Sequence, residues 1–395
     1  MRYRVLQCAS GTCKAFIGDK CGWRQKVLTC EKNELSDIYQ HGRHLTDVAS
    51  PRKPKLTREM KAYAEPLIYL RMKPNRIYNN VLDHFGHKEG ESPVLRQVQT
   101  FIGHFRRSAL NETDFVDDMV KLVNRTQFTV DMQDGAAFTF GYATNADGSP
   151  AIGEGLDDDP TIVGISAPYM MKMLRYAASY VFHIDTTNKL DLSGYPVLVV
   201  GVSDRSRSFH PVALFVMSQQ TGELIGNALH SLFDKYKAIT GEFPTIRYCM
   251  GDADKAQFNA IVEITTSKHP DNGPLLYLMC FFHVVKNVAD RVSSLSVEAV
   301  SLGFKHLYQM HYSKDSTEFT AKAEQALATW TAIPVLKSFA VYFKKQWIDS
   351  QFSNWGCYHT PTGFEKTNNP VEQFNNVIKR DYSLRTLLKL VALAD

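Results

Sequence analysis

The second half of the chain alternates apolar runs with amphipathic segments, which is the pattern of an α/β domain. Three apolar runs come first and predict strands, at 180–185, 195–203 and 210–218. A polar turn separates the last two runs, so we expect them to pair as antiparallel strands. Helix and strand then alternate, over 222–240, 245–250, 255–264 and 274–280. Together these elements predict one mixed sheet.

Helical periodicity takes over after the last of these strands. Residues 282–350 have it throughout, and a final helix covers 370–379. This order of elements is that of the ribonuclease-H-like fold with an all-helical insertion, at about 290–360, before the last helix. We therefore predict an α/β, ribonuclease-H-like core over 126–395.

The start of this predicted core, residues 126–165, is rich in Gly and Asp. It holds one expected strand, Phe138–Phe140. The acidic run Asp157–Asp159 is expected to be a solvated loop, and a metal site is the alternative. A helix over 166–179 should lead into the first strand of the sheet.

The first 125 residues divide into a Cys- and His-rich segment, 1–48, and a helical region, 56–125. Residues 49–55 between them are basic and rich in Pro, which is typical of a linker. Helices are predicted at 56–85, 94–107 and 112–125. Thr57 is the expected N-cap of the first helix, and Pro74 should break it in two. The two short helices could form a helix-turn-helix; an ordinary helical connector is the alternative.

Length and composition narrow the class of protein. A chain of 395 residues is long enough for two or three domains. No stretch approaches the ~18 apolar residues of a membrane span, and the N-terminus lacks the apolar core of a signal peptide. We expect a soluble, intracellular protein with no membrane partner.

Charge is divided unevenly along the chain. The total is only +4, but residues 1–110 contain 20 Lys and Arg against 10 Asp and Glu. That segment has a net charge of +10, and the rest of the chain has −6. A basic N-terminal segment attached to an acidic remainder suggests a polyanion-binding module. A merely solvated basic surface is the alternative.

The cysteines are also clustered. Four of the 7 fall within the first 30 residues, and the others are scattered. In an intracellular protein, clustered Cys indicate a metal site more often than disulfides.

Acidic residues follow the strands where a metal-dependent reaction would need them. Asp185 lies on the first strand and Asp252 directly after the fourth, and these two strands should be neighbours. Glu372 lies one turn into the last helix. Carboxylates that converge in this way bind the divalent cations of phosphoryl-transfer sites. Taken singly, each acid could be a turn residue or helix cap, and Asp254 fits best as the cap of the helix after it.

At these residues the sequence resembles the Mutator-like element transposases of the DDE superfamily. The resemblance covers about residues 180–380 and rests on four motifs in order: His183–Lys189, Gly251–Ala256 continuing to Asn259–Ile261, Cys280–His283 with Lys286-Asn287, and Thr367–Asn376. It implies that Asp185, Asp252 and Glu372 bind Mg²⁺ or Mn²⁺. The metal-bound acids would then activate water to cut double-stranded DNA at the terminal inverted repeats, and the freed 3′-hydroxyl would attack target DNA.

Two further pairs of residues lie near this predicted site. In related transposases the pair corresponding to Cys280 and His283 is close to the acids, so His283 is expected to hold a DNA phosphate or orient a ligand. A zinc half-site or plain core is the alternative for this pair. Trp347 and Trp355 could stack on an extruded base, although helix-core packing is the stronger expectation.

The N-terminal segment resembles the WRKY/FLYWCH-type zinc finger of the same family. Its matching residues are Tyr3-Arg4, Cys8, Cys13 with Lys14-Ala15, and His41-x-x-His44. The resemblance implies Zn²⁺ bound by Cys8, Cys13, His41 and His44. The spacing of the two His departs from the usual pattern, so Cys21 or Cys30 could replace one ligand. Arg24 and Lys26 are then candidates for DNA contact.

The leading hypothesis is a nuclear DNA transposase, with possible homo-oligomers on DNA. A transposase-derived transcription regulator that binds DNA without catalysis is the alternative. A metal-dependent nuclease without strand transfer is a third possibility.

Overall fold

The computed structural model describes residues 2–8, 10, 13, 21–30, 35–44, 55–86, 92–110, 112–268 and 275–395. The chain divides into two compact units, Met1–Phe105 and Arg106–Asp395. Of the predicted linker 49–55, only Lys55 is among the described residues. Lys14 and Ala15 of the finger motif also lie outside them.

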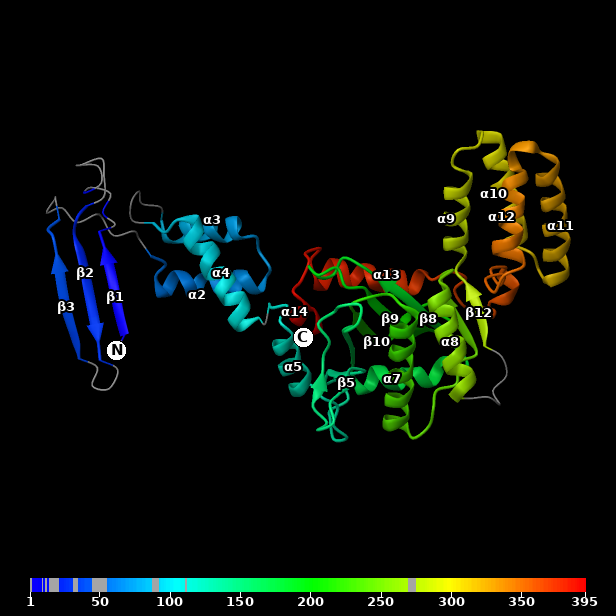
Figure 1. Ribbon diagram of the computed structural model, residues 1–395. Coiled ribbons are helices and arrows are strands. Elements are labelled where there is room, and N and C mark those ends of the chain that lie inside the picture. The colour runs from blue at the N-terminus through cyan, green and yellow to red at the C-terminus, as the bar shows by residue number, and fades with distance from the viewer. Residues whose placement is uncertain are drawn as a thin grey trace. The chain divides into compact units, whose positions relative to one another are not determined.

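The first unit begins with an antiparallel sheet and continues with helices (Figure 1). The sheet has the order β1-β2-β3, from Arg2–Gln7, Arg24–Thr29 and Ser36–His41. The helices that follow are α2 (Arg58–Tyr69), α3 (Pro74–Phe85) and α4 (Leu95–Ala109). The Thr57 side chain caps α2, and Pro74 is the first residue of α3, as predicted. Their buried side chains are apolar: Ala64, Ile68, Ile77, Val81, Val98 and Ile102.

The second unit is built on one mixed sheet, in the order β12-β11-β8-β9-β10-β7-β4. Its strands are β4 (Phe138–Phe140), β7 (Ile162–Ser166), β8 (Val181–Thr187), β9 (Val197–Ser203), β10 (Phe209–Met217), β11 (Tyr248–Gly251) and β12 (Leu276–Met279). β8, β11 and β12 run parallel, and the pairs on the other side of β8 are antiparallel. The predicted α/β class and mixed sheet are therefore confirmed, including the pairing of the first and fourth predicted strands.

Two local predictions near the first strand differ from the structure. The predicted helix over 166–179 is a short α6 (Pro168–Lys172) followed by a 3-10 helix, Met173–Ala178. The sequence pattern does not predict β7, because Gly- and Asp-rich loops precede its short apolar run. The acidic run Asp157–Asp159 is an exposed loop, as expected. A small hairpin, β5 (Ala143–Thr144) and β6 (Pro150–Ala151), lies in the same region.

Helices cover both faces of the sheet, and strand alternation decides which side chains face which helix. Phe182 and Ile184 of β8 belong to the core formed with α7 (Gly222–Thr240) and α8 (Lys255–Lys268). The opposite face packs on α5 (Val116–Arg125), α13 (Asn369–Val377) and α14 (Leu390–Ala394). His183 and Asp185 alternate with the first pair, so they face α13.

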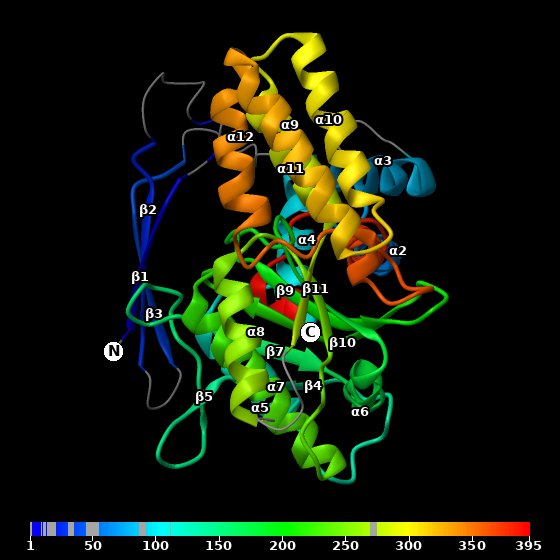
Figure 2. The same cartoon turned by 90° about the vertical axis from the view of Figure 1, so that its right-hand side faces the viewer.

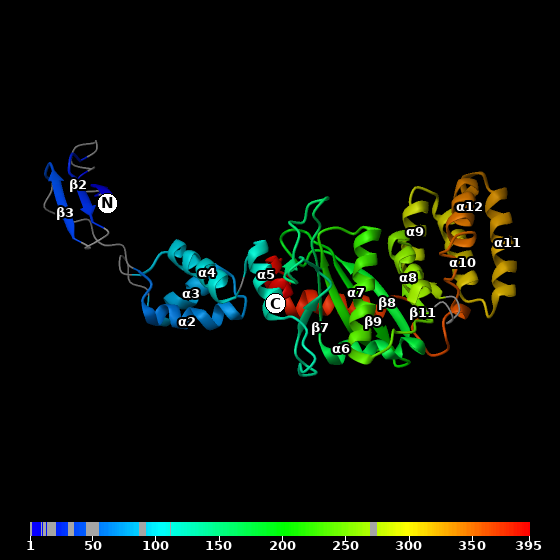
Figure 3. The ribbon, with the colours of Figure 1, turned by 60° about the horizontal axis from the view of Figure 1, so that its bottom comes forward.

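A helical insertion, whose helices α9 to α12 are labelled in Figure 2, connects β12 to α13, as predicted. It comprises α9 (Phe281–Val292), α10 (Val297–His311), α11 (Ser316–Ala332) and α12 (Lys337–Phe343), followed by one π-helical turn, Lys344–Ile348. Figure 3 shows these helices beside α8, on the side of the sheet where β11 lies. Trp347 and Trp355 are 1% and 2% exposed, so they pack in the core, which was the stronger expectation.

Among the described helices, no single one is long and apolar enough to cross a bilayer. One pair of helices with a 117° bend, Ser316–Ala332 and Pro334–Ile348, reaches that length and composition only when taken together.

Candidate active site and metal cluster

Three elements bring the predicted acids to one edge of the sheet. Asp185 is in β8 and is 8% exposed. β8 and β11 pair in parallel with Met250 opposite His183. Asp252 directly follows β11, two residues after Met250, so the same register continued leads from His183 to Asp185. Glu372 is in the first turn of α13, the helix packed against β8.

The charges of the three carboxyl groups act on one another. Burial raises the pKa of Asp185 to about 7, and the negative charges of Asp252 and Glu372 add to the effect. Burial also raises the pKa of Glu372, and Asp252 contributes. Such mutual repulsion is the property of a carboxylate set that a cation would stabilise. The geometry therefore brings together all three acids that the sequence singled out.

His283 lies between two of these acids, on the first turn of α9. Its Nδ1 is 2.7 Å from Asp252 Oδ1 and 3.9 Å from Glu372 Oε1. Burial alone would lower the pKa of His283, but contacts with Asp252 and Cys280 outweigh it and raise the pKa to about 10. The three atoms are buried, and within the described structure none makes a hydrogen bond of good geometry. His283 is thus a cationic side chain in contact with the acids.

Cys280, the N-cap residue of α9, is fully buried beside this site. Asp252, Cys280 and His283 offer ligand atoms that lie within 4.8 Å of one another. These three could therefore also hold a metal ion.

Two asparagines connect α13 to β8, the strand that carries Asp185, and the sequence motif alone did not reveal their roles. Asn375 Nδ2 donates to Asp185 Oδ2 at 2.7 Å. Asn368, the N-cap residue of α13, contacts His183 Nδ1 through Oδ1 at 2.7 Å. The signal in the sequence is their spacing from Glu372, four residues before it and three after it, which is one helical face.

The loop after β11 is fixed by neighbours. The Tyr277 hydroxyl donates to the backbone oxygen of Asp252 at 2.8 Å. Asp254 caps α8 as predicted, accepting from the backbone amides of Ala256 and Gln257 at 2.7 and 3.3 Å. A cavity of about 410 Å³ opens beside the acids, lined by Asp252, Ala253, Asp254, His283, Asn287, Tyr342, Gln346 and Trp347.

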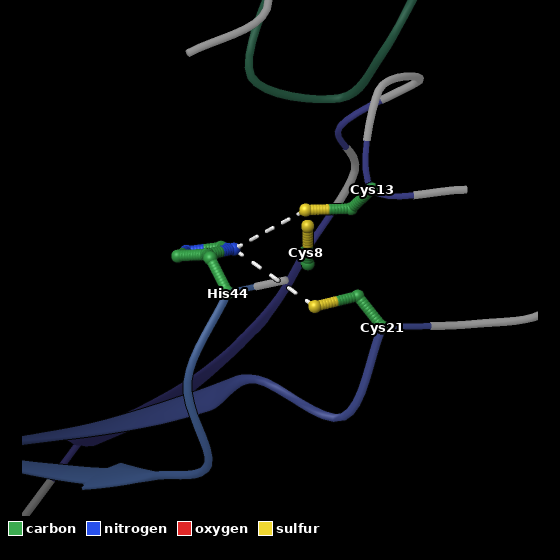
Figure 4. A group of neighbouring side chains, drawn as sticks. All are labelled: Cys8, Cys13, Cys21 and His44. Carbon is green, nitrogen blue, oxygen red and sulfur yellow. Dashed lines mark hydrogen bonds between the residues drawn. The ribbon is translucent and has the colours of Figure 1, made fainter. Parts of the chain in front are cut away.

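A second cluster lies at one end of the N-terminal sheet (Figure 4). Cys8, Cys13, Cys21 and His44 offer ligand atoms within 4.8 Å of one another. The Sγ atoms of Cys13 and Cys21 are each 3.9 Å from His44 Nδ1. Bond lengths of about 2.3 Å to sulfur and 2.0 Å to nitrogen put tetrahedral zinc ligands roughly 3.5–3.8 Å apart. The cluster could therefore bind a metal such as zinc.

One predicted ligand of this cluster is corrected by the structure. His41 is the last residue of β3, opposite Arg24, and it lies outside the cluster. Gly42, at φ +73°, turns the chain after the strand so that His44 reaches the thiols. The fourth position belongs to Cys21, one of the two substitutes considered. The other, Cys30, directly follows β2 at the opposite end of the sheet.

The predicted DNA contacts lie on the middle strand of this sheet. Arg24 and Lys26 are both exposed, and strand alternation puts them on one face of β2. Lys26 Nζ lies 5.5 Å from the centre of the Tyr3 ring, on the neighbouring strand. The face combines positive charge with an exposed aromatic ring.

Comparison with known proteins adds no assignment: no family model matches the chain, and no curated protein matches it significantly.

Proposed function

We propose that the chain is a DNA transposase of the Mutator-like, DDE type with a ribonuclease-H-like core. The observation that carries the proposal is the convergence of Asp185, Asp252 and Glu372 from β8, β11 and α13. Three antiparallel strands, two further parallel strands and a helical insertion before the last helix support the fold assignment.

The proposed cofactor of this centre is Mg²⁺ or Mn²⁺, held by the three acids. The fit to such an ion is supported by two buried carboxylate oxygens, Asp252 Oδ1 and Glu372 Oε1, which make no hydrogen bond of good geometry with any described residue and have only His283 Nδ1 nearby. Hard cations prefer such oxygen ligands. When bound, divalent cations supply positive charge to the attacking and leaving oxygens of a phosphoryl transfer.

The chain's own residues contribute orientation and charge around that centre. Asn375 holds one oxygen of Asp185 in place, and the Tyr277 hydroxyl holds the backbone of Asp252. His283 places a positive charge beside the acids. A DNA phosphate approaching three carboxylates would otherwise meet strong repulsion.

The N-terminal unit is proposed to hold the DNA. Zn²⁺ bound by Cys8, Cys13, Cys21 and His44 would fix the ends of the three strands, which supports a stable surface around Arg24 and Lys26. The net charge of +10 over residues 1–110 suits a phosphate backbone. Double-stranded DNA as partner, assembly as a homo-oligomer on it and nuclear location follow from the same proposal.

A cleavage assay with matched variants tests the proposal. The substrate is duplex DNA that includes the sequences flanking the coding region on both sides, incubated with Mg²⁺ or Mn²⁺. Wild type and Asp254→Asn should cut it and join the freed 3′ end to a second duplex. Asn at position 254 can still accept the helix-capping bonds. Asp252→Asn should not cut, because one metal-binding carboxylate is lost.

The outcomes separate the three functions considered. Cleavage without joined products would favour a simple nuclease. Specific DNA binding without cleavage, equal in wild type and Asp252→Asn, would favour a regulator derived from a transposase. Equal cleavage by wild type and Asp252→Asn would eliminate the assigned site.

A further inference from the structure

Two asparagines flank Glu372 on the buried side of α13. Asn368 is the N-cap residue, and Asn375 lies three residues after Glu372. Both are buried, with exposed fractions of 0% and 5%. The residue after each, Asn369 and Asn376, is also asparagine but is exposed. The helix therefore carries two Asn-Asn pairs in which only the first member is buried.

Asn375 acts on the Asp185 carboxylate. Its amide nitrogen donates to Asp185 Oδ2 at 2.7 Å, in a site where Asp185 is 8% exposed. A buried carboxylate bonded through one oxygen has a fixed orientation, and the donor stabilises its charge. A neutral amide does this without adding a further negative charge beside Asp252 and Glu372, whereas an acid at position 375 would increase the repulsion.

Asn368 connects α13 to three other elements. Its Oδ1 accepts from His183 Nδ1 at 2.7 Å, since an amide oxygen cannot donate. His183 Nε2 then accepts from the Ser203 hydroxyl at 2.7 Å. Asn368 Nδ2 donates to the Ile184 carbonyl at 3.4 Å, and its backbone amide donates to Cys280 Sγ at 3.1 Å. These bonds join the start of α13 to β8, β9 and the start of α9.

We propose that Asn375 and Asn368 are positioning residues of the divalent-metal centre. Asn375 orients the Asp185 carboxylate, and Asn368 fixes α13 so that Glu372 faces Asp252. This inference rests on the proposed function, because it assumes that the three acids bind the metal together. Groups that hydrogen-bond to metal ligands typically change metal affinity by about 10- to 100-fold when they are removed.

Mn²⁺ binding to the full chain, followed by electron paramagnetic resonance of the bound ion, tests the proposal. Asn375→Ala should weaken Mn²⁺ binding by about 10- to 100-fold. Asn376→Ala, on the same helix and exposed, should leave it unchanged. The half-saturating Mn²⁺ concentration for DNA cleavage should rise with the loss of affinity. The rate at saturating Mn²⁺ should stay closer to wild type, because all three acids remain.

A second matched pair, Asn368→Ala and Asn369→Ala, tests the role of the hydrogen bonds that Asn368 makes at the start of α13. Only the first variant should bind Mn²⁺ more weakly than wild type, because loss of the Asn368 bonds would release the start of α13 and displace Glu372. Thermal unfolding without metal identifies any variant that fails to fold. If Asn368→Ala is unfolded, the Asn375 and Asn376 pair still decides the question.

The outcomes also separate this inference from the function on which it rests. Equal Mn²⁺ affinity in Asn375→Ala and Asn376→Ala, with weaker binding by Asp252→Asn, would overturn the positioning role alone. Equal affinity in wild type and Asp252→Asn would overturn the metal centre, and the positioning role with it.

Discussion

The side chains of the two candidate sites differ in their chemistry, and this difference determines which ion each can bind. Cys8, Cys13, Cys21 and His44 offer sulfur and nitrogen, which suit Zn²⁺. Asp185, Asp252 and Glu372 offer carboxylate oxygens, which suit Mg²⁺ or Mn²⁺. Each site should therefore keep its own ion when both ions are present.

The first prediction concerns the zinc ligands, because the structure has Cys21 in the cluster in place of the predicted His41. Cys21→Ser and His44→Ala should lower zinc affinity by more than about 100-fold, beyond the loss typical of groups that only support a ligand. Cys30→Ser and His41→Ala should retain it, because neither residue belongs to the cluster. Titration with a competing zinc chelator measures the affinity. Zinc loss in His41→Ala with retention in Cys21→Ser would restore the ligand set expected from the sequence.

The second prediction concerns the pH dependence of stability. The pKa of Asp185 is raised from 3.8 to about 7 by burial and by the neighbouring acids. Between these two pKa values, Asp185 is protonated in the folded metal-free protein and ionised in the unfolded chain. The free energy of unfolding therefore falls as pH rises from about 4 to about 7. His283, whose pKa is also raised, adds to the fall only above about pH 6.5.

Asp185→Asn removes this carboxyl group and serves as the comparison. Relative to wild type, it should gain up to about 4 kcal/mol in the free energy of unfolding across that pH range. Urea unfolding at a series of pH values, with a chelator present, measures the difference. Parallel pH profiles for the two proteins would show that Asp185 titrates normally.

At the scale of elements, the apolar pattern predicts the strands and helices whose side chains are buried. β8, β9 and β10 lie within two residues of their predicted bounds, and α7 matches its predicted range. Continuous apolar runs identify such strands because both of their faces are covered. β7 is harder to predict, because it follows a long polar loop and its five residues are too few to show a clear hydrophobic periodicity.

The helical insertion gives a prediction at this scale. Trp347 is 1% exposed, and its backbone oxygen accepts from Trp355 Nε1 at 2.8 Å. Trp347→Ala should lower the free energy of unfolding by about 3–5 kcal/mol. Tyr312→Ala, at a position 64% exposed on the same insertion, should change it by less than about 0.5 kcal/mol. Chemical denaturation measures both. Unchanged stability in Trp347→Ala would be incompatible with core packing.

At the scale of the whole molecule, contacts between residues far apart in the chain could not be predicted from the sequence. The acids could be predicted because each follows or lies within a recognisable element. The bond from Asn368 to His183 spans 185 residues, and no local pattern specifies that pairing. Cys21 and His41 lie at the same end of the sheet, but His41 is still paired in β3, opposite Arg24, whereas Cys21 precedes β2 and is free to join the cluster. The points at which the strands begin and end decide between the two, and the spacing of Cys and His does not reveal them.

The net charge of the two parts of the chain matches the functions proposed for them, DNA binding for the first part and metal-dependent catalysis for the second. The basic first 110 residues have a net charge of +10 and hold the Cys/His cluster, while the acidic remainder holds the three converging carboxylates. The central claim is that those carboxylates form one metal centre.

Crystals of the wild-type chain soaked in Mn²⁺ test this claim most directly, through the anomalous scattering of the ion. We predict an anomalous peak bounded by Asp185, Asp252 and Glu372, and its loss in Asp252→Asn. Mn²⁺ bound elsewhere, with no peak among these three carboxylates, would contradict the account.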